Sequence, residues 1–146
     1  MGVKTFSESE LSGRDKYRRN ANNPYEFTED PYAPWDVSST GKVHTYNTEI
    51  KDRDIPYTKY EKEGYWLEKI KYDALIKAYK ETGSLPIYLN YFQDGIGFWW
   101  NLLDVQPEWE WRWATDTTAN GTYGQKKVKK LVTFVFPKDG KQFKYE

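Results

Sequence analysis

The stretch Thr45–Arg53, TYNTEIKDR, carries the pattern on which the expected fold depends. Its residues alternate as in a β-strand, and side chains two residues apart on a strand point to the same face of the sheet. Glu49 and Lys51 therefore share one face, whereas Ile50 between them points to the other. An acid beside a base is either a surface ion pair or half of a metal-dependent catalytic site.

The segment at the start of the chain predicts a short polar helix over residues 5–19. Ser7 and Glu10 have the spacing of a capping box, in which each residue satisfies a free N–H group at the helix start. Gly13 and a thin apolar pattern weaken this helix.

A hairpin is expected between that helix and the opening stretch. A first strand lies within 25–39, where two prolines interrupt it. A turn over 40–42 then leads into the second strand, 43–53. The two strands are therefore expected to pair in antiparallel fashion.

The clearest helical pattern covers 65–82, and Gly83 stands where a left-handed C-terminal cap is expected. Apolar residues recur here at helical spacing, namely Leu67, Ile70, Ala74, Leu75 and Ala78. Lys71 falls in the middle of the same face. Its ammonium group either reaches water along its stem or borders a site that carries negative charge.

Strands are also expected after this helix, over 85–92 and 96–103 with a turn between them, and over 128–136. The order α, β, β, α, β, β with a β-rich tail predicts a mixed α/β, or α+β, core. The 146 residues suit one domain. Its core would cover about 5–103, with the aromatic tail over 104–146.

The composition excludes several classes of protein. The 22 basic and 22 acidic residues balance, so no global field attracts nucleic acid or membranes. The absence of cysteine excludes disulfide scaffolds and cysteine-based zinc sites or nucleophiles. The sequence has no signal-like apolar segment and no long apolar run, and we expect a soluble, cytoplasmic protein without a membrane partner.

Two local runs of basic residues could still contact DNA phosphates, although such runs more often form a solvated surface. The first run lies near the start of the chain and the second near its end: Arg14, Lys16, Arg18 and Arg19, and Lys126, Lys127, Lys129 and Lys130.

The carboxylates that could hold a metal are Asp36, on the first strand of the hairpin, and Glu49, on the second. Two carboxylates on adjacent strands can bind Mg²⁺, a hard cation that prefers oxygen ligands, and Mn²⁺ can substitute. The backbone carbonyl of Ile50 could add a third oxygen. Lys51 could then orient or deprotonate a water and offset charge on a phosphate.

The pattern Pro34-x-Asp36 followed by Glu49-x-Lys51, in an α-β-β-α-β order, resembles the PD-(D/E)XK nuclease superfamily. This resemblance covers about residues 5–103 and implies a restriction-endonuclease-like core, as in small phage nucleases and Holliday-junction resolvases. It implies that Asp36 and Glu49 are metal ligands, Lys51 is the catalytic lysine and Lys71 supports it. Members often add a glutamate from the first helix, for which Glu8 and Glu10 are the candidates.

Trp35 departs from the family's Pro-Asp dipeptide, because it separates the proline from the acid. A second acid-x-Lys pattern, Asp139–Lys141, lies in a turn and lacks the strand context. His44 is the only histidine, which excludes multi-histidine metal sites and histidine-based nucleophile dyads. Glu68 could pair with Lys71 or Lys51.

Arg53 shares the face of Glu49 and Lys51, so it either contacts a phosphate or pairs with Asp52 or Asp54. The alternating Trp109, Trp111 and Trp113 favour a strand with one side in the core, although tryptophans can also stack on bases or sugars. Because these residues each allow two interpretations, the sequence supports two hypotheses of function.

The first hypothesis is a Mg²⁺-dependent DNA endonuclease in which a homodimer would cut two strands. The second is a non-catalytic binding module whose aromatic strands hold carbohydrate, single-stranded nucleic acid or a protein. The second predicts that Trp109 or Trp113 is exposed and that Lys71 pairs only with Glu68.

Overall fold

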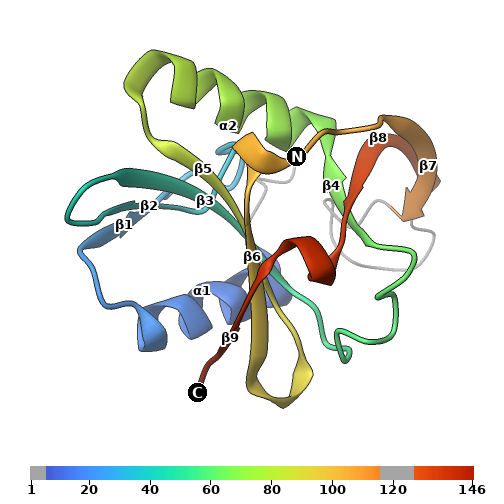
Figure 1. Ribbon diagram of the computed structural model, residues 1–146, viewed down its shortest axis with the longest axis horizontal. Coiled ribbons are helices and arrows are strands. Elements are labelled where there is room, and N and C mark those ends of the chain that lie inside the picture. The colour runs from blue at the N-terminus through green and yellow to red at the C-terminus, as the bar shows by residue number, and fades with distance from the viewer. Residues whose placement is uncertain (1–5, 116–126) are drawn as a thin grey trace, which may run out of the picture.

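The computed structural model describes residues 6–115 and 127–146 as a mixed α+β fold (Figure 1). Its elements follow the chain as α1 (Glu8–Asn20), β1 (Tyr25–Phe27), β2 (Val37–Thr40), β3 (Thr45–Asp52), β4 (Tyr65–Glu68), α2 (Lys69–Thr82), β5 (Leu85–Tyr91), β6 (Ile96–Asn101), β7 (Glu110–Thr115), β8 (Lys127–Val135) and β9 (Lys141–Lys144). Short 3₁₀ turns cover Gln93–Gly95, Leu102–Asp104 and Pro137–Asp139. The expected order α-β-β-α-β is confirmed, and β1 and β4 are added to it.

The strands form a six-stranded sheet and a three-stranded sheet. The larger sheet has the order β1-β2-β3-β5-β6-β9, and the smaller has the order β4-β8-β7. Only the β3–β5 pair is parallel among the described pairs, and α2 makes the crossover between these two strands. The segment after residue 103 contributes to both sheets, because β9 pairs with β6 in the larger sheet and β8 pairs with β4 in the smaller one.

The two helices lie on opposite faces of the larger sheet, α2 at the top of Figure 1 and α1 at the bottom. Ser7 and Glu10 form the expected capping box at the start of α1. Gly13 was expected to weaken this helix, but it lies where α1 packs closely against the sheet. A Cβ at Gly13 would lie 2.9 Å from the Cγ2 of Ile50 on β3.

The second helix begins at Lys69, and the expectation that it begins at residue 65 is wrong. Tyr65–Glu68 is strand β4, which pairs with β8. Leu67 belongs to this strand, so it does not share a helical face with Ala74 and Leu75. Ile70, expected on the apolar face, is 73 % exposed. Gly83 does cap the helix in the left-handed conformation, with φ of 81°.

Aromatic residues fill the core on both faces of the larger sheet. On the α2 face they join aliphatic residues in one cluster: Tyr65, Leu67, Leu75, Tyr88, Phe92, Phe98, Trp100, Leu102 and Val135. On the α1 face the cluster is Val37, Ile50, Leu89 and Tyr91. These rings supply the buried area that the modest aliphatic content does not.

The expectation that the tryptophans of the tail face the core is wrong for two of the three. Trp111 is 62 % exposed and Trp113 is 61 % exposed. Trp109 is half-buried, with its ring centroid 5.2 Å from that of Tyr72 on α2. The smaller sheet extends beyond the core at β7, so strand alternation there does not imply burial.

Neither helix of the described residues has the length and apolar character needed to cross a lipid bilayer.

The observed packing of α2 predicts that Leu75→Ala lowers the free energy of unfolding by about 2–5 kcal/mol, because Leu75 is fully buried. Ile70→Ala on the same helix should change it by less than about 0.5 kcal/mol. Urea denaturation of both variants measures the difference. The opposite ranking would contradict this packing of α2.

Candidate active site

Asp36 and Glu49 lie beside each other where β2 begins against β3. The N–H of Asp36 donates to the carbonyl oxygen of Thr48 at 2.9 Å, and its Oδ2 accepts from the N–H of Ile50 at 2.8 Å. Only 7 % of Asp36 and 5 % of Glu49 is exposed. The hairpin thus brings together the two acids that the sequence singled out, in a buried setting.

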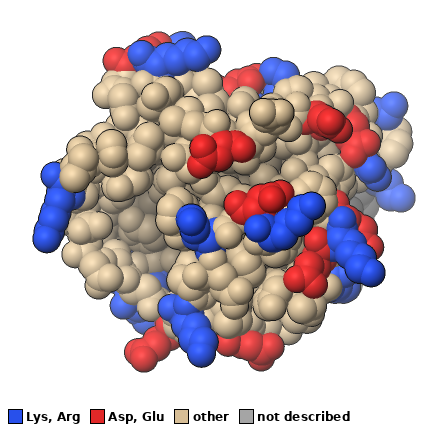
Figure 2. Space-filling model, in the orientation of Figure 1, with Lys and Arg blue, Asp and Glu red and all other residues tan. Residues whose placement is uncertain are grey.

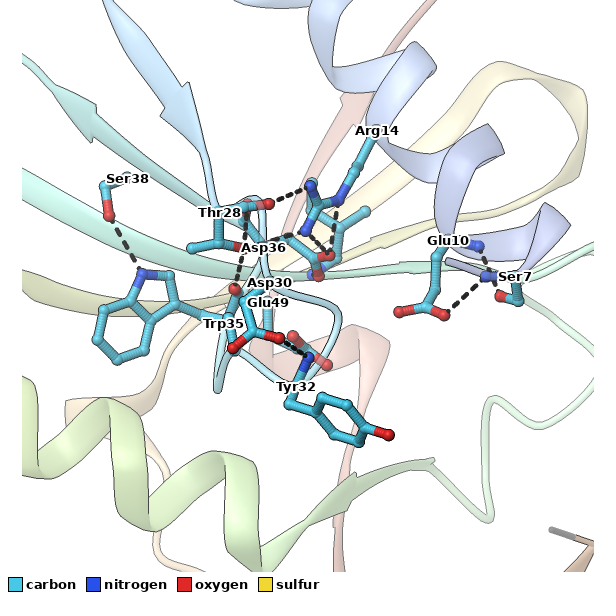
Figure 3. A network of polar contacts seen from close by, with 12 residues as sticks. Ser7, Glu10, Arg14, Thr28, Asp30, Tyr32, Trp35, Asp36, Ser38 and Glu49 are labelled. Atoms are coloured by element: carbon cyan, nitrogen blue, oxygen red, sulfur yellow. Dashed lines mark hydrogen bonds and ion pairs between the residues drawn. The ribbon is translucent and has the colours of Figure 1, made fainter. Parts of the chain in front are cut away.

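Arg14 of α1 neutralises Asp36. Its Nε and Nη2 both lie 3.1 Å from Oδ1 of Asp36, and Nη1 donates to the carbonyl oxygen of Thr28 at 2.6 Å (Figure 3). Arg14 itself is buried. The expectation that it contacts DNA phosphates is therefore wrong, because its guanidinium is inside the protein. The signal in the sequence was its position directly after Gly13, which fixes the side of α1 that meets the sheet.

Glu49 has an unusually high proton affinity. Burial raises the pKa of its carboxyl to about 8, and the nearby charge of Asp36 adds to this, while Lys51 and Lys71 oppose it. The Nζ of Lys71 lies 3.9 Å from Oε2 of Glu49 and donates to the carbonyl oxygen of Ala33 at 3.4 Å. The side chain of Lys71 is thus turned toward Glu49, whose raised pKa favours the protonated carboxyl group at neutral pH.

Lys51 remains an ammonium ion. Burial alone lowers its pKa, but the charges of Glu49, Tyr88 and Glu68 outweigh that effect and raise it. Register places Lys51 opposite Asn90 on the parallel strand β5. A lysine in this state acts on a neighbouring phosphate or water as a positive charge and a hydrogen-bond donor.

Among the described residues no acid forms an ion pair with Arg53, so the expected pairing with Asp52 or Asp54 is wrong, whereas its contact with a phosphate stays a prediction. Its guanidinium donates to the Oδ1 of Asn90, to the hydroxyl of Tyr88 at 2.9 Å and to the carbonyl oxygen of Trp66 at 3.1 Å. Arg53 therefore ties β3 to β5 and β4. The Nδ2 of Asn90 has no partner within the described part of the chain.

The candidate acids of the first helix lie away from the site. Glu10 accepts from the N–H of Ser7 at 3.0 Å, and both stand apart from Asp36 and Glu49 in Figure 3. Glu8 is an exposed residue in the first turn. The side of α1 that faces the site carries Arg14, of opposite charge to the glutamate that the resemblance implied.

The other basic residues of the first run make ion pairs. The Nζ of Lys16 lies 2.7 Å from Oδ1 of Asp52, whose Oδ2 also accepts from Ser12. Arg18 and Arg19 are exposed and pair with Asp15 at 3.4 and 3.0 Å. Charges of both signs are interspersed over the face seen in Figure 2.

The second basic run lies on β8. Lys127 is exposed, and the Nζ of Lys129 lies 5.2 Å from the ring centroid of Trp113. Lys130, and not Lys71 or Lys51, forms the ion pair with Glu68, at 3.2 Å, although the charge of Glu68 still helps to raise the pKa of Lys51. Lys126 lies outside the described residues.

The number of possible metal ligands is small. Among residues 6–115 and 127–146, no group of three or more His, Cys, Asp or Glu side chains could hold a metal ion. The available protein oxygens are those of Asp36 and Glu49, with the backbone of Ile50 next to them. Mg²⁺ commonly binds one or two carboxylates and takes its other ligands from water and phosphate.

Comparisons with known proteins support the fold. No protein-family model matches the sequence, and no curated protein matches it. Among solved structures, the fold is similar to that of Hjc, a Holliday junction resolvase from the archaeal hyperthermophile Archaeoglobus fulgidus. The similarity has a TM-score of 0.51 at 8 % sequence identity, and it covers 88 % of this chain and 89 % of the other. The restriction-endonuclease-like fold expected from the sequence is thereby confirmed.

Removal of Arg14 should leave Asp36 buried without a counter-charge. We expect Arg14→Ala to lower the free energy of unfolding by about 3–5 kcal/mol. The exposed Arg18→Ala should cost less than about 1 kcal/mol. Thermal or urea unfolding measures both. Equal small losses would show that Asp36 does not depend on Arg14.

Glu49 should make stability depend on pH in the absence of metal. Its carboxyl has a pKa near 4.5 when unfolded and about 8 when folded. Between these values the folded state keeps a proton that the unfolded state has released, so stability falls as pH rises, by about 1.4 kcal/mol per pH unit. In Glu49→Gln this contribution should vanish.

Urea denaturation in EDTA from pH 5 to pH 8 gives the difference between wild type and Glu49→Gln. Glu81→Gln, on an exposed glutamate of α2, is the matched control. A wild-type slope equal to that of Glu49→Gln would contradict the raised pKa.

Proposed function

We propose that this chain is a metal-dependent endonuclease that hydrolyses phosphodiester bonds in DNA. The observation that carries the proposal is the buried pair Asp36 and Glu49 with Lys51 on the same strand face as Glu49. The fold similarity to a Holliday junction resolvase supports it. The exposed Arg18, Arg19, Lys127 and Lys129 would contact backbone phosphates, which makes binding salt-sensitive.

The donor set fits a hard divalent cation such as Mg²⁺, with Mn²⁺ as a substitute. Asp36 and Glu49 would each offer a carboxylate oxygen, and the carbonyl of Ile50 points to the same side of the strand as the N–H that binds Asp36. Burial and the neighbouring Asp36 raise the pKa of Glu49 to about 8, and a bound cation would favour the ionised form of this carboxyl group. The bound ion would act as a Lewis acid and lower the pKa of a bound water.

The side chains around these ligands would have separate roles. Arg14 would hold Asp36 in one orientation. Lys51, as an ammonium ion, would orient the attacking water and offset charge on the phosphate. Lys71 would pair with Glu49 in the free protein and turn to the scissile phosphate when DNA is bound. Two copies of the chain would be needed to cut two strands.

The alternative, a non-catalytic aromatic binding module, has one observation in its favour and one against it. Trp113 is exposed, as that hypothesis requires. Lys71 pairs with Glu49, however, whereas the hypothesis requires that it pair only with Glu68. The second observation concerns the candidate site itself, so it favours the nuclease.

The test is cleavage of supercoiled plasmid, linear duplex and four-way-junction DNA with Mg²⁺ or Mn²⁺. We expect metal-dependent cutting that falls at least about 100-fold in Lys51→Ala and in Glu49→Ala, because each removes a group that acts on the reacting phosphate or water. Lys77→Ala, on an exposed lysine of α2, is the control and should retain activity. Folding of each variant is checked by circular dichroism.

If folded wild-type protein cuts none of the three substrates, the proposed nuclease function is contradicted. Cutting that survives in Lys51→Ala would instead place the chemistry at another site.

A further inference from the structure

The smaller sheet separates its charges by face. In an antiparallel pair, residues opposite each other lie on the same face. Trp113 is opposite Lys129 and Trp111 is opposite Leu131, so these four share one face. Lys127, two residues before Lys129, lies on that face too. We call Trp111, Trp113, Lys127 and Lys129 the Trp ridge.

The opposite face of the smaller sheet is electrically balanced. It carries Glu110 and Arg112, which pair at 3.0 Å, and Glu68 and Lys130, which pair at 3.2 Å. The Trp ridge has no acid on its face of β4, β7 or β8, and no described acid pairs with Lys127 or Lys129. The ridge therefore combines exposed aromatic rings with unneutralised positive charge.

The four side chains of the Trp ridge are solvent-exposed within the described part of the chain. β7 is the edge strand of the smaller sheet and lies at the outer side of the molecule (Figure 1). Trp111 and Trp113 are each more than half exposed, at 62 % and 61 %. An exposed aromatic pair on an edge strand gains no packing energy from the core, so its area is available for a partner.

From this arrangement we propose that the Trp ridge binds single-stranded nucleic acid by stacking its bases between and upon the two indole rings. Side chains two residues apart on a strand are separated by about 6.8 Å, since each residue rises about 3.4 Å. Successive bases also rise by about 3.4 Å. One unpaired base would therefore enter between the rings, and Lys129 would move its ammonium group from the Trp113 ring, where it lies 5.2 Å from the centroid, to an adjoining phosphate.

A duplex cannot use this site without cost, because a base pair must unstack to admit a ring. A second copy of the chain is a poorer occupant, since a two-fold interface would set the ridge lysines of one copy against those of the other. A polynucleotide supplies the anions that these lysines lack. The inference rests on the proposed function only in that the bound strand would be an unpaired part of the substrate.

The first experiment is fluorescence anisotropy with a labelled oligothymidylate of about 12 nucleotides, a length typical of single-strand sites. EDTA is present so that nothing is cut. Trp111→Ala and Trp113→Ala should each weaken binding at least about fivefold. Trp113→Phe should retain most of the affinity, because it keeps an aromatic face. Trp99→Ala, on an exposed tryptophan of the larger sheet, is the control and should bind within about twofold of wild type.

A second measurement compares the same variants on a duplex of equal length. Duplex binding should change less than about twofold in the tryptophan variants, because phosphate contacts alone carry it. Lys129→Gln should reduce the slope of log affinity against log salt by about 0.7 for the single strand.

Three results would overturn the inference. The first is single-strand affinity that does not respond to Trp111→Ala or Trp113→Ala more than to Trp99→Ala. The second is an equal loss on duplex and single strand. The third is a wild-type dimer that Trp111→Ala converts to a monomer in sedimentation, which would make the ridge a self-association surface.

Lys51→Ala separates this inference from the proposed nuclease. If wild-type protein binds the single strand through its tryptophans but cuts no DNA, the proposed nuclease activity is contradicted and the proposed binding by the Trp ridge is supported. If Lys51→Ala abolishes cutting but single-strand binding does not depend on the tryptophans, the nuclease activity is supported and the binding by the Trp ridge is contradicted.

Discussion

Two neighbouring carboxyl groups, Asp36 and Glu49, are buried at the start of the central hairpin, and the rest of the site is arranged around their electrostatic cost. A buried carboxylate loses its hydration and must be paired or protonated. Arg14 pairs with Asp36, whereas Glu49 keeps its proton and faces Lys71. These partners come from α1 and α2, so both helices must pack against the hairpin of β2 and β3.

Alternate side chains of β3 point to opposite faces of the sheet, so this one strand faces both helices. Ile50 packs on the α1 side, where Gly13 allows the helix backbone to approach. Glu49 and Lys51 lie on the other side with Tyr88 and Asn90 of β5. Arg53 closes this polar side by side-chain hydrogen bonds to two strands, β5 and β4. The chemistry is thus set on the more polar face of an otherwise aromatic core.

In the smaller sheet, too, alternate side chains separate polar from aromatic residues, but here the aromatic residues are exposed. Alternation along β7 and β8 sends the paired charges Glu110 and Arg112 to one face and the exposed Trp111 and Trp113 to the other. Because the sheet extends past the core at this edge, its second face stays in solvent. A ring-lined, cationic surface results beside a fold that is similar to a nuclease.

By itself the sequence determined the α-β-β-α-β order, the capping box at Ser7 and the meeting of Asp36 with Glu49, because local periodicity and one hairpin register fix these features. Only the tertiary structure decided that Arg14 neutralises Asp36, that Tyr65–Glu68 is a strand and that Trp111 is exposed. Each of these depends on which distant element covers the residue, and periodicity along the chain carries no information about that partner.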